Sequence, residues 1–215
     1  MRTVVRQIDR ALKDIYRIPT PQNAESFLVR HPVGDQPFDG ALLVQPGADL
    51  SLGIYLSEHV RRNLADFRRS RQAELVEGWT VPQLNAFLVA VEEVSHFHCL
   101  LHHVHHGATV TQLEMEIQGE IDKFLLAFFA GALGAHPTDA AFYALFEQLF
   151  QKFHWAEGVG AAERARYEEA NQLAKAFILK WAIGIWDPAR RERHFALLRR
   201  FYRLPFFQKV ALFQP

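Results

Sequence analysis

The stretch that decides the fold runs from Thr80 to Gly107 and reads TVPQLNAFLVAVEEVSHFHCLLHHVHHG. Thr80 followed by an early proline is typical of a helix start, and Gly107 is typical of a helix end, so we predict one long helix over Val81–His106. Apolar residues surround this helix almost completely, which predicts burial on most sides. Six of the chain's eleven histidines lie between His96 and His106. Because buried polar side chains need partners, the helix should have a polar neighbour.

The next segment supplies that neighbour. We predict a second helix over Thr111–Leu133, and the short connection makes the two helices antiparallel. Residues equally far from the loop centre then lie level, which places Glu120 beside His96 or Phe97 and Glu116 beside residue 100 or 101. Thr111 and Glu114 fit a capping box, so we interpret Glu114 as part of a helix cap.

Two interpretations of this hairpin remain open. The pairs Glu93 with His96, and Glu116 with Glu120, each lie one turn apart on their helix. Together they can form a four-ligand site for zinc, iron or manganese. The alternative is a buried network in which His96 and Lys123 neutralise the carboxylates of the second helix. Only one Glu-x-x-His pair is present, which is fewer than di-iron carboxylate bundles carry.

The polar residues of the first helix fall into two stripes on a helical wheel. One stripe holds Glu92, His96, Cys99 and His103, and the other holds His98, His102 and His105. Cys99 has apolar neighbours and is predicted to be inert core. It is the only cysteine, so no intramolecular disulfide can form and a reducing, cytoplasmic location is expected.

The rest of the chain predicts a small sheet and further helices. A helix is expected over Arg2–Tyr16, a strand over Glu25–Arg30, and a β-hairpin from Ala41–Gln45 and Leu50–Leu56, with Gly53 marking a bulge. Ser57 is a plausible N-cap for a helix to about Gln72. Later helices are predicted over Asp139–Lys152, Ala161–Gly184 and Pro188–Tyr202.

The predicted fold class is therefore α+β and mostly α: a small N-terminal antiparallel hairpin or sheet, then a bundle of about five helices. We predict a small α/β region over residues 1–75 and a helical bundle over residues 76–215, forming one compact unit.

Charge is unevenly distributed along the chain. The net charge is zero, which argues against a nucleic-acid binder, but residues 73–169 are acidic and residues 170–215 are basic. The segment over residues 190–207 interleaves arginines with aromatic side chains, so it either docks on the bundle or binds a partner. No apolar run approaches the length of about 20 residues needed for a transmembrane helix. Nucleotide-loop, serine-hydrolase and dithiol motifs are absent from the sequence.

Two functions follow from these patterns. The first is a small cytoplasmic interaction or accessory protein with a protein partner or a homodimeric state, in which the His/Glu network is structural. The second is a metal-dependent helical-bundle enzyme with its site between the helices over residues 80–106 and 111–133. The sequence leaves open whether the protein is an enzyme.

Overall fold

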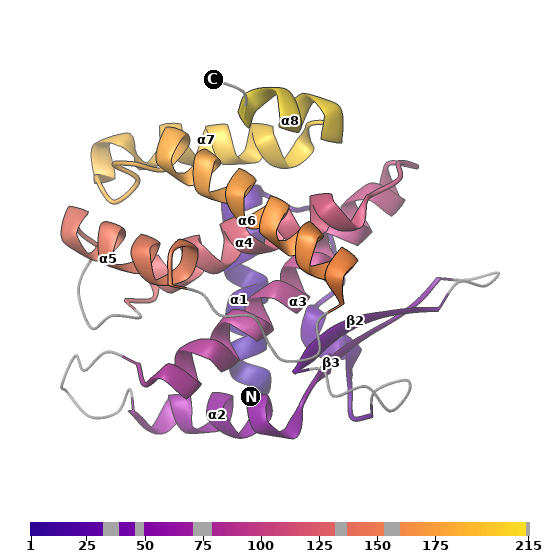
Figure 1. Cartoon of the computed structure of the whole chain (residues 1–215). Helices are drawn as coiled ribbons and strands as arrows, with labels where there is room; N and C mark the ends of the chain where they lie inside the picture. The colour runs from indigo at the N-terminus through magenta and orange to yellow at the C-terminus, as the bar shows by residue number, and fades with distance from the viewer. Residues whose placement is uncertain (32–38, 46–49, 71–78, 132–136, 153–159, 214–215) are drawn as a thin grey trace.

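The computed structural model describes residues 1–31, 39–45, 50–70, 79–131, 137–152 and 160–213, except for the side chains of 67–70. In chain order its elements are α1 (Arg2–Tyr16), the 3-10 helix η1 (Ala24–Phe27), β1 (Leu28–Val29), β2 (Gly40–Gln45), β3 (Ser51–Leu56), α2 (Glu58–Ser70), α3 (Val81–His105), α4 (Gln112–Phe129), α5 (Asp139–Phe150), α6 (Ala161–Trp181), α7 (Pro188–Arg203) and α8 (Phe206–Phe213). Figure 1 shows the sheet at one side of a helical body with α3 and α4 at its centre. The predicted α+β, mostly α class is confirmed.

The sheet has the strand order β1, β3, β2. β2 and β3 pair in antiparallel fashion, as predicted, and their turn at residues 46–49 lies outside the described residues. β1 adds to β3 in parallel and contains only Leu28 and Val29, because η1 occupies the first half of the predicted strand. The expected bulge at Gly53 is wrong, since Gly53 pairs regularly with Leu43. A Cβ at Gly53 would lie 3.0 Å from Val29 Cγ1, so glycine here lets β1 approach closely.

The helix starts are set by side-chain caps. Thr80 and Gln83 form a complete capping box at α3, and Ser57 Oγ accepts a hydrogen bond from the Val60 amide at α2. At α4, Thr111 Oγ1 accepts from the Glu114 amide at 3.1 Å, but the Glu114 carboxylate contacts Lys209 and a histidine instead of completing the box. Our interpretation of the Glu114 side chain as a cap is therefore wrong, because two cations bind a buried carboxylate more strongly than one amide does.

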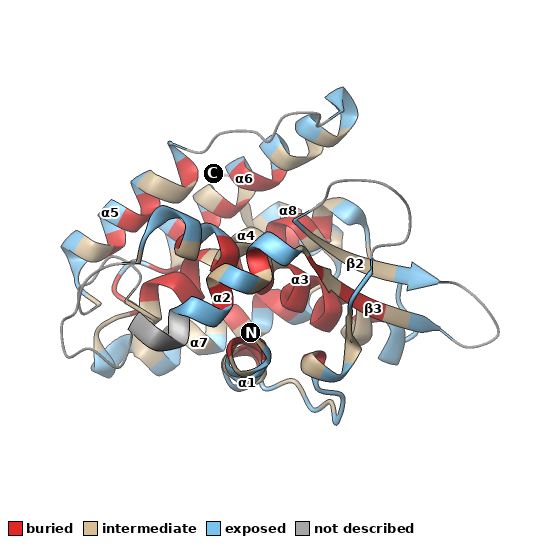
Figure 2. Cartoon of the chain, turned by 90° about the horizontal axis from the view of Figure 1, so that it is seen from below, coloured by how far each residue is buried: buried red, intermediate tan, exposed pale blue. Residues whose placement is uncertain are grey.

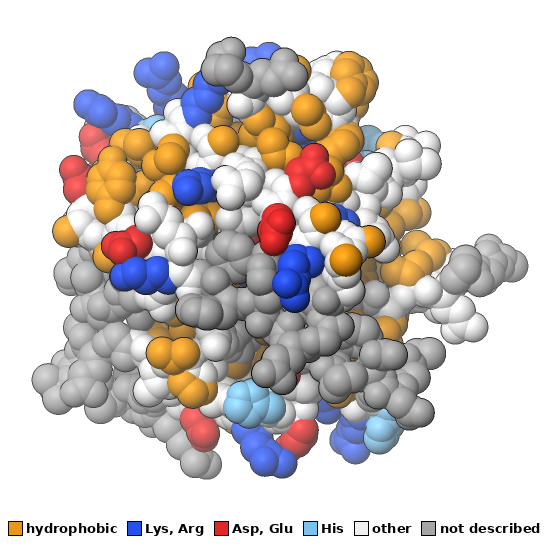
Figure 3. All heavy atoms as spheres, in the orientation of Figure 1, with side chains coloured by type: hydrophobic (Ala, Val, Ile, Leu, Met, Phe, Trp, Pro, Cys, Tyr) orange, Lys and Arg blue, Asp and Glu red, His pale blue; other side chains and the backbone are white. Residues whose placement is uncertain are grey.

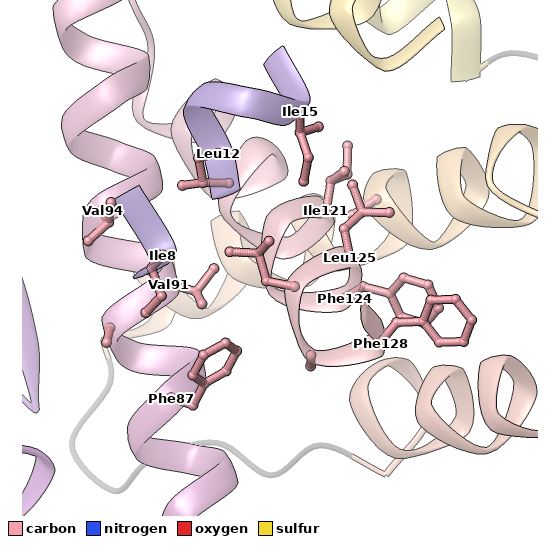
Figure 4. Close-up of a cluster of buried hydrophobic side chains, with 14 of the residues drawn as sticks. Ile8, Leu12, Ile15, Phe87, Val91, Val94, Ile121, Phe124, Leu125 and Phe128 are labelled. Atoms are coloured by element: carbon pink, nitrogen blue, oxygen red, sulfur yellow. The ribbon is translucent and has the colours of Figure 1, made fainter. Parts of the chain in front are cut away.

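The core forms where α1, α3 and α4 meet and extends to α5. Figure 4 shows apolar side chains of these first three helices converging, among them Leu12, Val91 and Phe124. Phe124 is fully buried and contacts the rings of Phe142 and of three other phenylalanines. Figure 2 shows the buried residues of α3 and α4 gathered in the interior. Burial of each such aromatic side chain contributes about 1.5–3 kcal/mol to folding.

The basic C-terminal segment docks on the bundle. Arg199 Nε donates to the Ile15 carbonyl at 2.7 Å, and an Arg203 guanidinium nitrogen donates to the Tyr16 carbonyl at 2.8 Å. The Tyr202 ring stacks on Tyr16 with centroids 4.5 Å apart. On the face shown in Figure 3, basic side chains gather at the upper left, where α7 lies. Helix α8 was not predicted; it follows the extended residue Leu204, where α7 ends.

One described helix, α3, is long and apolar enough by composition to cross a membrane. However, 67% of its apolar window is buried inside the protein, which is typical of the central helix of a soluble fold. Its apolar residues do not form one uninterrupted run, so this helix was not predicted to be long and apolar enough to cross a membrane.

Candidate metal centre between α3 and α4

The site lies where α3 and α4 pack against each other, with α6 against α4. Gly119 of α4 faces His96 of α3: a Cβ at position 119 would lie 3.3 Å from His96 Nε2 and 3.6 Å from Glu92 Cγ. The predicted antiparallel alignment, which placed Glu120 level with His96, is therefore correct to within one residue. The missing side chain at Gly119 leaves room for the imidazole and a carboxylate between the helices.

His96 is the centre of this site. It is 9% exposed, and its Nε2 lies 3.5 Å from Glu116 Oε2 while its Nδ1 lies 4.0 Å from Glu93 Oε2. Neither distance is matched by a hydrogen bond, and among the described residues Nε2 has no hydrogen-bond partner. Burial disfavours the charged imidazole, but Glu116, Glu93 and Glu92 outweigh burial and raise the pKa of His96 to about 9.

Glu92 completes a group of three potential ligands. Glu92, His96 and Glu116 each offer one ligand atom, and these atoms lie within 4.8 Å of one another. Glu92 and His96 are one full turn apart and so lie on the same face of α3. A Glu and a His from one helix thus meet a carboxylate from the next.

The four residues predicted as ligands are brought together only in part. His96 and Glu116 are in the group of three, whereas Glu93 lies on the Nδ1 side of the imidazole. Glu120 binds Lys123, whose Nζ donates to Glu120 Oε1 at 2.6 Å and to Glu92 Oε2 at 3.0 Å. The helical stripe that holds Glu92 and His96 was the sequence signal for the residue that joins the group of three, Glu92. The Glu-x-x-His spacing led to the prediction of Glu93 in its place.

Glu93 is a buried acid with an unpartnered oxygen. Its side chain packs against Gly40 of β2, where a Cβ would lie 2.9 Å from Glu93 Oε1. Among the described residues Glu93 Oε2 has no hydrogen-bond partner, and burial raises the pKa of Glu93 to about 8. This carboxylate can accept a hydrogen bond from His96 Nδ1 once the imidazole moves toward it, an arrangement that commonly orients metal-binding histidines.

Helix α6 adds groups that the sequence analysis did not place here. Arg166 Nε lies 3.5 Å from Glu116 Oε1 and has no hydrogen-bond partner among the described residues. Burial, followed by the charges of Glu116 and Glu92, raises the pKa of Tyr167. Because Tyr167 belongs to an apolar stripe and Arg166 precedes it, no local pattern marks either residue as part of the site.

Other buried histidines of α3 have direct partners and provide a comparison. His98 Nε2 lies 2.9 Å from Asp9 Oδ1, and His103 Nδ1 donates to the Cys99 carbonyl at 2.8 Å. Cys99 is 1% exposed, in agreement with its predicted place in the core. His96 differs from these two histidines in that its nearest carboxylate oxygen, on Glu116, lies at the longer distance of 3.5 Å and a second carboxylate lies 4.0 Å from its other ring nitrogen.

Comparison of the chain with protein-family models, curated proteins and solved structures finds no significant match. The function is therefore inferred from the chemistry of the chain's own residues.

Proposed function

We propose that this is a cytoplasmic metal-binding helical protein, in which one divalent transition metal binds Glu92, His96 and Glu116. The observation that supports it is a buried imidazole nitrogen without a partner, whose neighbouring carboxylate oxygens belong to a group within 4.8 Å. A purely structural network would be expected to satisfy such a nitrogen, as the contacts of both ring nitrogens of His103 do.

The ligand types fit zinc, iron or manganese. One imidazole and two carboxylates suit these borderline ions, and a bound ion would replace the proton that the neighbouring carboxylates keep on His96. Glu93, on the other face of the imidazole, is the natural acceptor for Nδ1–H. Lys123 and Arg166 hold Glu92 and Glu116 from outside the group, so each carboxylate is oriented before an ion arrives.

The ion's role in this proposal is to join α3 to α4. Because Glu116 also contacts Arg166, the ion's influence extends to α6. Four clefts formed by described residues have other linings, and Glu92, His96 and Glu116 line none of these four. A metal-dependent enzyme is the second candidate, since three protein ligands leave a coordination position for water or substrate. An accessory protein with a metal-free network is what remains when no ion binds.

The test begins with elemental analysis of the purified protein and with thermal unfolding at increasing Zn²⁺, Mn²⁺ and Fe²⁺. Because exposed histidines near the end of α3 can bind metal unspecifically, the background for these measurements is the double variant His105→Gln/His106→Gln. At a free concentration about 100 times Kd, an ion should stabilise the folded protein by about 2.7 kcal/mol. Stoichiometric binding by the background protein is the expected result.

The ligand variants are Glu92→Gln, His96→Gln and Glu116→Gln, each with the charge or ring removed but a side chain of similar size retained. Each should abolish the metal-dependent rise in Tm, and Glu168→Gln, an exposed acid of α6, should leave it intact. A background protein that binds none of the three ions contradicts the proposal, and so does a His96→Gln variant that binds them as tightly as the parent.

A further inference from the structure

A second candidate site lies at the loop end of the α3–α4 hairpin. A cleft of about 770 Å³ opens between the end of α3, the start of α4 and the turn from α7 to α8. This volume is within the range of about 300–1,000 Å³ typical of small-molecule sites. One wall is apolar and is formed by Leu204, Pro205, Phe206 and Phe207. Phe207 is 71% exposed, the largest exposed fraction among the large hydrophobic side chains described.

Tyr202 supplies an unused polar group to this cleft. The residue lines the cleft and is 3% exposed, yet its hydroxyl has no hydrogen-bond partner among the described residues. Its ring is held by the stack on Tyr16, which restricts the hydroxyl to one place. A buried hydroxyl without a partner destabilises the folded protein, so a bound ligand that accepts a hydrogen bond from it would recover that loss.

A buried positive charge lies beside this hydroxyl. Lys209 Nζ donates to Glu114 Oε1 at 2.7 Å, and His103 Nε2 lies 3.3 Å from the same oxygen. Both neighbours of the His103 ring are acceptors, the Cys99 carbonyl and this carboxylate, so both ring nitrogens carry protons. Two cations thus share one carboxylate, and one positive charge is left over.

The other charged groups nearby do not remove this excess. Arg203 lines the cleft and adds a positive charge, but its guanidinium donates to the carbonyls of Arg199, Tyr16 and Arg17. Asp122 is buried, does not line the cleft, and accepts hydrogen bonds from Ser95, Tyr16 and Gln118. These two charges oppose each other, so the cleft keeps its net positive charge.

We propose that this cleft binds a small monocarboxylic acid with an apolar body. The carboxylate accepts the Tyr202 hydroxyl and balances the single excess charge of the His103–Glu114–Lys209 cluster. The apolar body lies along Leu204 and Phe207. A single uncompensated positive charge matches a monoanion better than a phosphate dianion. His102, which also lines the cleft, has its pKa lowered to about 4 by burial and by the cations around it, so a bound anion should raise that pKa.

The probes are octanoate and its neutral analogue octanol, titrated into the full chain and followed by NMR shifts of the His102 ring and by calorimetry. Octanoate should bind at least tenfold more tightly than octanol and should raise the pKa of His102. Equal binding of the two probes, or an unchanged His102 titration in saturating octanoate, overturns the proposal.

Tyr202→Phe is the decisive variant, because it removes only the hydroxyl and keeps the ring stack. It should weaken octanoate binding about tenfold while leaving thermal stability unchanged or higher, since an unpartnered buried hydroxyl is lost. Tyr143→Phe, at a tyrosine that is 49% exposed on α5, is the matched control and should change neither quantity. His96→Gln should retain octanoate binding, which separates this site from the metal centre. Full octanoate affinity in Tyr202→Phe contradicts the proposal.

Discussion

Asp9 should be the polar residue whose loss destabilises the fold most clearly. It is 2% exposed on α1 and joins three elements: Oδ1 lies 2.9 Å from His98 Nε2 of α3 and accepts the Ala24 amide of η1 at 3.1 Å. Lys13 Nζ, one turn further along α1, lies 3.0 Å from the other carboxylate oxygen. These contacts replace water around a carboxylate that burial would otherwise penalise.

The expected magnitude follows from these three contacts. A hydrogen bond from a buried histidine to a charged carboxylate contributes about 1.5–3 kcal/mol, and the hydrogen bond from the Ala24 backbone amide contributes about 1 kcal/mol. The Lys13 pair, on the outer face of α1, adds about 0.3–0.5 kcal/mol. Asp9→Ala should therefore lower the free energy of unfolding by about 3–5 kcal/mol, and Asp9→Asn, which keeps one acceptor, by about 1–2 kcal/mol.

The assay is urea unfolding at neutral pH, with Asp14→Asn as the control on the same helix. Asp14 is exposed, and its substitution should change stability by less than about 0.5 kcal/mol. The m-value should stay constant so that the midpoint reports stability. An Asp9→Ala midpoint within the range of the Asp14 control would refute the reasoning.

Low pH should remove the contribution of the Asp9 carboxylate to the free energy of unfolding. Burial works to raise the pKa of Asp9, but the bonds from His98, Ala24 and Lys13 outweigh burial and lower it. A carboxylate with a lowered folded-state pKa contributes stability above its unfolded value of 3.8, and this contribution disappears as the pH falls through the folded value. The difference between wild type and Asp9→Asn should therefore shrink in unfolding measurements below pH 3.8.

Gly119→Ala should reduce metal affinity, because the new Cβ lies 3.3 Å from His96 Nε2, and it should leave α4 folded, because alanine favours a helix over glycine by about 1 kcal/mol. Calorimetric titration measures the metal affinity and circular dichroism measures the helix content. Unchanged affinity would show that His96 is not a ligand. His102 has a folded-state pKa of about 4, below its ordinary value of 6.5. Between these pH values its ring is protonated in the unfolded chain but neutral in the folded protein, so the free energy of unfolding should fall as the pH drops from 6.5 to 4. Urea unfolding at several pH values in that range should show that the free energy of unfolding depends less on pH in His102→Gln than in the wild type. The same pH dependence in both proteins would argue against a neutral His102 ring.

Regular patterns made most of the fold predictable. The bounds of α1 are those expected, because its apolar face and the following prolines leave one solution, and the start of α3 follows from Thr80. Helix α8 was missed because Pro205 and two adjacent phenylalanines resemble a tail, and its place depends on Lys209 reaching Glu114, 95 residues away. The strand before the hairpin was predicted too long because the short 3-10 turn η1 has no strong sequence signal.

The candidate site was predictable only in outline. Hairpin geometry brought His96 level with the carboxylates of α4, but the choice among four glutamates depends on where Lys123 and Arg166 reach. Lys123 binds both Glu120 and Glu92, and both contacts depend on side-chain conformation. Local spacing does not encode such competition between partners.

The contacts of Arg199 and Arg203 with the end of α1 have a consequence for synthesis of the chain. The Tyr16 carbonyl accepts a hydrogen bond from Arg203, which lies 187 positions later in the sequence. At about 5–20 residues per second, translation takes roughly 10 to 40 s to cover that separation. During this interval α1 can pack on α3 and α4, but its last turn stays without the arginines that satisfy its carbonyls. The final native contacts should therefore form only after the seventh helix is made, which makes the last turn of α1 a late-folding segment exposed to chaperones and proteases.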